Sequence, residues 1–407
     1  MNAYNLNQGQ DISGMIGSCQ VARRMHNLAA KFVRDKSAVH VVDPNVDFRS
    51  RFADLPRLQR DLDARNIGGD SEKVAKDYKK WWTLFAKQQT TNAEGPEKQN
   101  LRAALLDESE GLLSALRLPN EVDPECHDAE PRTKNLSTPT HVNWLKRYGM
   151  IAVDSENCLL QLVGLPVVLQ TRIIGALEKI FDNDGFAKIS APYVVRAAMI
   201  EAFNIEKDRF VAFSSDNSQP LHLVGVNGVT LSSVFTRTSF SSTNLWPIRY
   251  YSSGMTYPYG SASPDQCNLY NSRQRMNFST ILISRSEKES LEVRQRVESL
   301  IAQFLKEQLN LDNIWRTCHS LELEKHEKLA KVVANDHANL VRSSSTGTYI
   351  SRRMNIVSEK EKTSSLAHID FVEVDLNAVL GHVFETFFVK SEEKLPHLIE
   401  DCTNYLG

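Results

Sequence analysis

The sequence predicts an α+β fold in which an antiparallel sheet is flanked by helices and preceded by an N-terminal antiparallel helical hairpin. Two observations lead to this prediction. The β-rich runs after residue 141 outnumber the helices and do not alternate with them regularly, as they would in a doubly wound parallel sheet. Residues 71–117 carry apolar side chains at helical spacing on both sides of a short turn segment.

The composition restricts the functional classes. The 407 residues include 48 Lys and Arg against 50 Asp and Glu, and this balance excludes a globally basic nucleic-acid binder. No run of 18 apolar residues occurs, so no membrane partner is expected. The 6 cysteines lie far apart without a C-x-x-C pair, which excludes a disulfide scaffold and a compact zinc finger and predicts no metal site.

Residues 1–40 form a basic N-terminal extension. Up to Arg34 it contains one acidic residue, Asp11, and several basic ones. An arginine-containing, acid-poor N-terminus is typical of a mitochondrial presequence. The same composition suits a solvated surface helix in front of the first domain.

Residues 41–120 are predicted to form a helical domain whose hairpin, 71–117, projects as an arm. Each arm has a single apolar seam, which favours a two-stranded antiparallel coiled coil over a bundle core. The first arm also carries basic residues beside aromatic ones, a combination typical of an RNA-gripping surface and equally of a solvated helix face. The RNA-binding candidates are Lys73, Lys76, Lys79, Lys80 and Lys87.

A proline-rich linker at 118–140 leads into a mixed domain at 141–407. One long helix is predicted from Pro166 to Asp182, and a second begins at the capping box Ser286-Glu287-Lys288-Glu289. Strands are expected at 186–195, 209–214, 221–227, 248–253, 277–285, 314–324, 340–345 and 369–376.

In this order the segments resemble a seryl-tRNA synthetase, a class II aminoacyl-tRNA synthetase with an N-terminal coiled-coil arm. The helix 166–182 and the strand ending at Pro192 look like motif 1. Asn277-Phe278 is similar to the Gln-Phe of motif 2, whose ring stacks on adenine, and Gly381 matches the motif 3 glycine. The subgroup that the chain resembles most is that of the degenerate seryl-tRNA synthetase-like insect mitochondrial proteins.

The resemblance implies a site for ATP, Mg²⁺ and serine, but the residues at its functional positions differ. The motif 2 Arg and Glu fall in Tyr257-Pro258-Tyr259, the motif 3 Arg aligns with His382, and the carboxylate near the end of motif 3 aligns with Val389. The Thr-x-Glu loop that holds the amino group aligns with Val226-Asn227-Gly228. The degenerate positions are therefore Val226, Gly228, Pro258, Tyr259, His382 and Val389.

These differences predict a chain without catalysis. Loss of even one preorganised charge stabiliser typically costs two or more powers of ten in rate. We therefore expect no catalytic residue and no cofactor. Phe278 remains a vestigial adenine-stacking candidate, although a phenylalanine in a strand is more often a core residue, and that interpretation is favoured.

The sequence thus predicts an inactive seryl-tRNA synthetase paralogue that acts as a binding or regulatory subunit. The resemblance implies the mitochondrial matrix, the active mitochondrial seryl-tRNA synthetase as heterodimer partner, and tRNA or another mitochondrial RNA as ligand. The alternatives are an aminoacyl-adenylate-forming enzyme that uses ATP through a rebuilt site, and an RNA-binding homodimer without a synthetase partner. Because the motif 1 region is strongly apolar, its interface candidates are Ile173, Ile174, Ile189 and Pro192.

Overall fold

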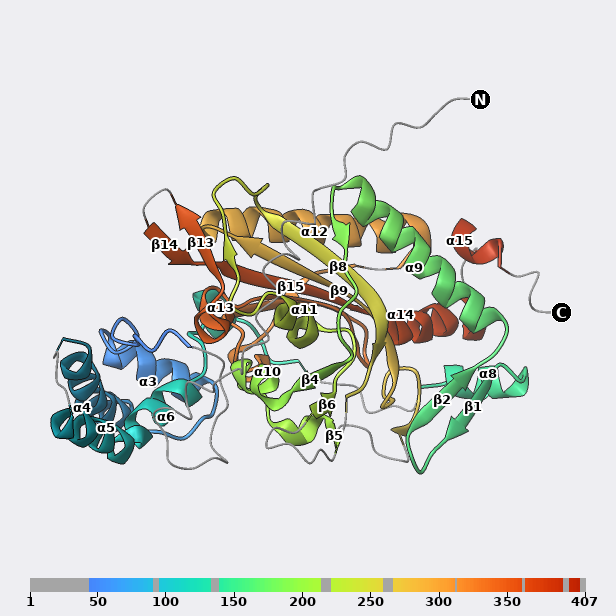
Figure 1. The fold of residues 1–407 in the computed structure, drawn as a ribbon. Coiled ribbons are helices and arrows are strands. Elements are labelled where there is room, and N and C mark those ends of the chain that lie inside the picture. The colour runs from blue at the N-terminus through green and yellow to red at the C-terminus, as the bar shows by residue number, and fades with distance from the viewer. Residues whose placement is uncertain are drawn as a thin grey trace.

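The computed structural model describes residues 44–90, 95–132, 139–213, 221–258, 266–311, 313–360, 363–390 and 395–402. A small helical domain at the N-terminal side of this range leads into a larger domain built on an antiparallel-rich sheet with helices on both faces (Figure 1). The predicted α+β class is confirmed.

The helical domain has an aromatic core. Tyr78 and Trp81 are 2% and 0% exposed and pack with Phe48 and Phe52, which precede the first helix of the domain. The predicted hairpin is present, but its second half is broken at Glu108, and both pieces contact the first helix of the hairpin. The second arm of the hairpin is therefore two consecutive helices that both pack on the first arm, rather than one continuous helix. The helices are α3 (Leu55–Ala64), α4 (Ser71–Thr90), α5 (Pro96–Asp107) and α6 (Ser109–Arg117).

The larger domain contains a 7-stranded sheet with the strand order β10-β11-β12-β15-β9-β8-β3. All neighbouring strands are antiparallel except β3 and β8. The strands are β3 (Ala187–Lys188), β8 (Ile248–Thr256), β9 (Arg275–Ser284), β10 (Arg316–Thr317), β11 (Leu329–Ala334), β12 (Asn339–Ser345) and β15 (His368–Asp375).

Two helical layers cover the sheet, and alternate residues of each strand serve one layer or the other. In β9, Phe278 and Leu282 point into the core under α9, α12 and α14, whereas Ile281 and Ile283 pack under α10, α11 and α13. The first layer consists of α9 (Leu165–Asn183), α12 (Glu287–Leu309) and α14 (Leu376–Val383), which the π-helical segment η4 (Phe384–Val389) continues. The second consists of α10 (Ala197–Ala202), α11 (Gly228–Val234) and α13 (Tyr349–Met354).

Short elements complete the domain. Its remaining helices are α7 (Pro124–His127), α8 (His141–Arg147) and α15 (His397–Glu400). The hairpin β1 (Ile151–Asp154) and β2 (Leu159–Leu162) precedes α9. Two 3-stranded sheets contain β4 (Val194–Arg196), β5 (Val211–Phe213) and β6 (Leu221–Leu223), and β7 (Ser239–Phe240), β13 (Val357–Lys360) and β14 (Thr363–Leu366).

The two long helices start where their capping residues predict, since Pro166 lies in the first turn of α9 and the Ser286 hydroxyl accepts from the Glu289 N–H at 3.3 Å. The predicted strand at 314–324 is mostly wrong. Only β10 is extended, and a 3₁₀ turn (Ser320–Glu322) follows because the His319 ring accepts from the Leu321 N–H at 3.2 Å. Strand β11, which the sequence analysis did not predict, lies between β10 and β12.

Candidate functional site

The described residues enclose a cavity of about 950 Å³ over the face of the sheet that carries α10, α11 and α13. Its floor comes from β8, β9, β12 and β15, and its walls from the N-terminus of α11, the loop before β9 and the segment before β11. Its lining side chains include 4 basic and 4 acidic groups, so the cavity has no excess of positive charge.

The floor of the cavity is formed by Asn277 of β9 and Glu373 of β15. Asn277 Nδ2 donates to the Val226 carbonyl at 3.0 Å, and Glu373 Oε1 accepts from the Gly228 N–H at 2.8 Å. Burial raises the pKa of the Glu373 carboxyl. The backbone at Gly228 approaches Phe371 closely, because a Cβ there would lie 3.1 Å from the ring and the ring would have to shift. The strand ends and the start of α11 are thus fastened to one another.

Arg275 and Asp375 form an ion pair at one end of the cavity. The Arg275 Nη1 to Asp375 Oδ2 distance is 2.8 Å, and the two side chains are 19% and 21% exposed. Arg275 also donates to the Ser272 carbonyl at 2.9 Å. Asp375 Oδ1 caps α14 by accepting from the Ala378 N–H at 3.0 Å. The Asp375 carboxylate therefore both holds the Arg275 guanidinium and caps the N-terminus of α14.

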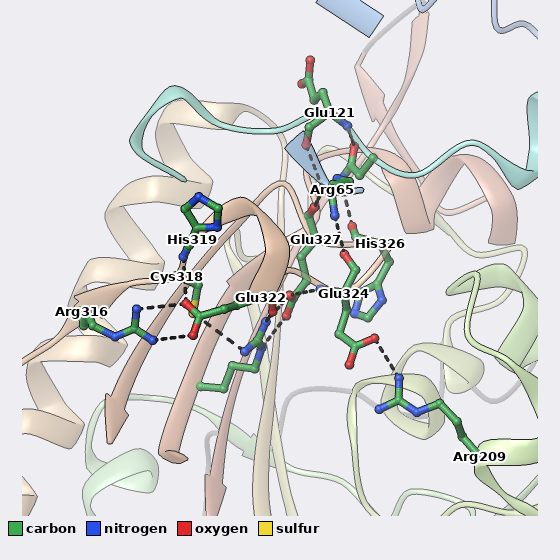
Figure 2. Close-up of polar contacts among 12 residues, drawn as sticks. Arg65, Glu121, Arg209, Arg316, Cys318, His319, Glu322, Glu324, His326 and Glu327 are labelled. Carbon is green, nitrogen blue, oxygen red and sulfur yellow. Dashed lines mark hydrogen bonds and ion pairs between the residues drawn. The ribbon is translucent and has the colours of Figure 1, made fainter. Parts of the chain in front are cut away.

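A second ion pair, Arg342 with Glu327, lies in the opposite wall. Arg342 Nε donates to Glu327 Oε1 at 2.7 Å, and its Nη2 pairs with the other carboxylate oxygen. Burial opposes ionisation of Glu327, but Arg342 holds the pKa of its carboxyl below the ordinary value. Figure 2 shows Glu327 beside His326 and Glu324, with Glu324 reaching Arg209. The Arg209 Nη1 to Glu324 Oε2 distance is 2.8 Å.

The same wall anchors the helical domain (Figure 2). Arg65, at the end of α3, donates to the carbonyls of Glu324 and Glu327 at 3.1 and 2.6 Å. On the other side of the contact, Arg353 of α13 donates to the Leu116 carbonyl at 2.8 Å. Arg65 and Arg353 are 8% and 1% exposed. Two buried guanidinium groups thus join the arm domain to the cavity wall.

A third polar cluster lies behind the loop that precedes β9. Glu385 accepts from His141 Nδ1 at 3.0 Å and from the Tyr270 hydroxyl at 3.0 Å. His141 Nε2 in turn accepts from the Leu269 N–H at 3.2 Å, which fixes the proton on Nδ1. Burial opposes ionisation of Glu385, but the hydrogen bonds from His141 and Tyr270 lower its pKa to about 2. The cluster ties the loop to η4, which continues α14.

The structure brings some of the predicted degenerate positions to the cavity. Gly228 and Pro258 line it, and the buried Val226 contributes its carbonyl to the floor. His382 and Val389 are half-buried on α14 and η4 and do not line the cavity. Tyr259 lies outside the described residues.

Of the two interpretations of Phe278, the structure supports the core phenylalanine and not the adenine-stacking ring. The ring is 0% exposed and lies in the core, stacked on Tyr251 with centroids 5.2 Å apart and next to Phe181 of α9. The pleat of β9 turns Phe278 away from the cavity and turns its neighbour Asn277 toward it.

The four interface candidates differ in how deeply they are buried. Ile173 is fully buried in the core, so it is not available to a partner. Ile174 and Ile189 are half-buried and Pro192 is exposed. Exposed apolar side chains nearby are Val163 and Val167, which are 58% and 41% exposed at the start of α9. Of the five predicted RNA-binding lysines, all are exposed on α4.

The sequence analysis missed the residues that set the charge of the cavity. Glu373 and Asp375 could have been found, because they alternate with Val372 and Val374 in β15 and must share one face. The ion pairs of Arg275 and Arg342 could not, because each joins positions from separate strands or loops.

In the part of the chain that the structure describes, no helix is long and apolar enough to cross a membrane. Among those same residues, no group of 3 or more His, Cys, Asp or Glu side chains is arranged to hold a metal ion.

No protein-family model and no curated protein matches the sequence. Solved structures do. The cytoplasmic serine-tRNA ligase from Naegleria fowleri in complex with AMP has a TM-score of 0.69 at 13% identity, over 91% of this chain and 98% of that one. The seryl-tRNA synthetase from Pyrococcus horikoshii complexed with ATP has a TM-score of 0.64 at 15% identity, over 88% and 92%.

A more distant match is the prolyl-tRNA synthetase from Giardia lamblia in complex with prolyl-adenylate, with a TM-score of 0.58 at 11% identity over 66% of this chain and 56% of that one. The two matches to serine enzymes cover about nine-tenths of this chain, whereas this match covers two thirds. The chain therefore has a class II, seryl-tRNA synthetase-like fold.

Proposed function

We propose that this chain is a catalytically inactive seryl-tRNA synthetase paralogue that acts as a binding or regulatory subunit. The observation that supports it most strongly is that each arginine lining the described cavity is paired with a carboxylate. Arg209, Arg275 and Arg342 contact Glu324, Asp375 and Glu327, respectively.

Activation of serine requires attack on the α-phosphate of ATP, and its transition state needs fixed positive charge at the phosphoryl oxygens. A guanidinium already neutralised by a carboxylate offers little of that charge. Two of the matching structures contain AMP or ATP. A polyphosphate placed over this floor would instead lie near the Glu373 carboxyl, whose ionised form would repel it.

The proposed partner is the active mitochondrial seryl-tRNA synthetase, in a pseudo-symmetric heterodimer formed through the motif 1 region. The half-buried Ile174 and the exposed Val163 and Val167 support an interface there. We place the complex in the mitochondrial matrix on the basic N-terminal extension, and RNA on the five exposed lysines of α4.

Two measurements test the proposal. The first is Mg²⁺-dependent ATP–pyrophosphate exchange by the purified chain with serine and then with the other amino acids. No exchange above background is expected, and robust exchange would support the ATP-using alternative and overturn inactivity. The second is native mass spectrometry after co-expression with the mitochondrial enzyme, for which a one-to-one complex is expected.

An Ile174→Glu variant should lower the mass of that complex to that of the separate chains while the unfolding transition stays cooperative. An Ile173→Glu variant is the matched control, because its core position predicts loss of cooperative unfolding instead. If the co-expressed chain is found only as a homodimer and not in a complex with the synthetase, the heterodimer is refuted and the RNA-binding homodimer is supported.

A further inference from the structure

Two cysteines that are distant in the sequence meet beside the cavity. Cys158 lies at the end of the turn between β1 and β2, and Cys267 lies in the loop between β8 and β9, where it lines the cavity. In Figure 1 the β1–β2 hairpin lies beside the ends of β8 and β9. Cys158 is 0% exposed, whereas Cys267 is half-buried and lines the cavity.

The contacts place the sulfurs next to each other. Cys158 Sγ lies 3.4 Å from the Asn271 carbonyl, four residues after Cys267, and Cys267 Sγ lies 3.9 Å from the Leu159 carbonyl, one residue after Cys158. The Arg273 N–H donates to the Cys158 carbonyl at 3.0 Å. The turn between β1 and β2 therefore contacts the loop before β9 at several points around Cys158 and Cys267.

The backbone at Cys158 is also unusual. Its φ is 54°, in the left-handed region that asparagine and glycine tolerate best. Of the 6 non-glycine residues with positive φ in the described segments, 4 are asparagines. A cysteine with this φ adds backbone strain to the turn, which is consistent with a functional role for its thiol.

We propose that Cys158 and Cys267 form a reversible disulfide that clamps the loop before β9 to the β1–β2 hairpin at the edge of the cavity. The oxidant is a low-molecular-weight disulfide such as glutathione disulfide. Cys267 Sγ attacks one oxidant sulfur and releases one glutathione thiol, and Cys158 Sγ then displaces the second. Two S–H bonds and one oxidant S–S bond break, one protein S–S bond forms, and the two glutathione sulfurs take up both protons.

Burial and the neighbouring Cys158 raise the pKa of the Cys267 thiol to about 12. The thiolate is the attacking species, so the rate of clamping should increase about tenfold for each pH unit around neutrality. The clamp is therefore slow to form at neutral pH, and glutathione or another thiol in excess reopens it.

The test uses the purified full-length chain and a Cys19→Ser variant, since Cys19 lies outside the described residues. Each is equilibrated with glutathione disulfide, unreacted thiols are alkylated, and disulfide-linked peptides are identified by mass spectrometry. We expect one cross-linked peptide pair that contains Cys158 and Cys267. Hydrogen exchange at 266–275 should fall in the oxidised form, because the clamp restricts the loop.

Cys267→Ser and Cys158→Ser should each abolish the cross-link, whereas Cys126→Ser should not, because the Cys126 thiol is fully buried elsewhere. If Cys158→Ser fails to fold, the Cys267→Ser variant alone decides. Separate alkylation of Cys158 and Cys267 after complete equilibration would overturn the proposal, as would glutathione remaining on Cys267. Neither result depends on whether the chain has synthetase activity.

Discussion

If paired arginines are what prevent nucleotide binding, releasing one of them should restore it. The informative change is Asp375→Asn, which removes the carboxylate that holds Arg275. The asparagine Oδ1 can still accept from the Ala378 N–H, so α14 keeps its cap. Arg275 keeps its hydrogen bond to the Ser272 carbonyl and stays in the cavity.

The size of the effect follows from the interaction that becomes available. A charge-assisted hydrogen bond from a guanidinium to a phosphate oxygen contributes about 2–3 kcal/mol. That corresponds to a dissociation constant for AMP that is about 30- to 150-fold lower than for the unchanged chain. The variant should lose only about 1 kcal/mol of folding free energy, because the broken ion pair is partly exposed.

Calorimetric titration with AMP measures the dissociation constant, and urea unfolding measures the stability. The matched control is Asp184→Asn, which releases Arg249 and Arg296 outside the cavity and should leave AMP binding unchanged. A folded Asp375→Asn variant with the same AMP affinity as the unchanged chain would show that the ion pair is not what limits binding. Tight ATP binding by the unchanged chain would refute the reasoning directly.

Three further results are expected. Arg342→Ala leaves the Glu327 carboxylate buried without its partner and should lower the free energy of unfolding by about 3–5 kcal/mol in urea titrations, whereas Arg342→Met combined with Glu327→Leu should recover most of that stability. Because the pKa of Glu385 is about 2, below its ordinary 4.5, its carboxylate stabilises the fold above pH 4.5 and this contribution disappears as the pH falls toward 2; urea midpoints of Glu385→Gln should lack that part of the acid dependence. Alanine at three exposed arm lysines should weaken RNA binding and reduce the slope of log affinity against log salt by about one unit for each phosphate that the arm no longer neutralises, and an unchanged slope would place the RNA elsewhere. These lysines are Lys76, Lys79 and Lys80.

The elements with strong local signals were predictable from the sequence. Helices α9 and α12 have a first-turn proline and a capping serine, and their apolar periodicity is regular. The segment 314–324 misled the analysis because its apolar alternation imitates a strand, whereas the His319 cap turns the chain into a 3₁₀ turn. The break at Glu108 was not predicted, and no side-chain cap hydrogen bond marks the start of α6 there.

The sequence predicts which groups the candidate site lacks, but not which residues line it. The absence of the motif 3 arginine at position 382 stays a prediction, and an ion pair such as Arg342 with Glu327 exists only after β11 and β12 have been placed side by side. For a related reason the sequence kept two interpretations of Phe278 open, because one step along β9 exchanges the cavity face for the core face.

The two buried arginines between the domains affect which extended ligands the chain can bind. Arg65 and Arg353 each bond main-chain carbonyls of the other domain, so swinging the arm would strip several hydrogen bonds from buried charges. The arm lysines and the cavity are therefore kept at one separation and one angle. An RNA or a partner protein that contacts both the arm lysines and the cavity must therefore be long enough to reach from one to the other. The chain would then discriminate between ligands by their length, without moving its arm.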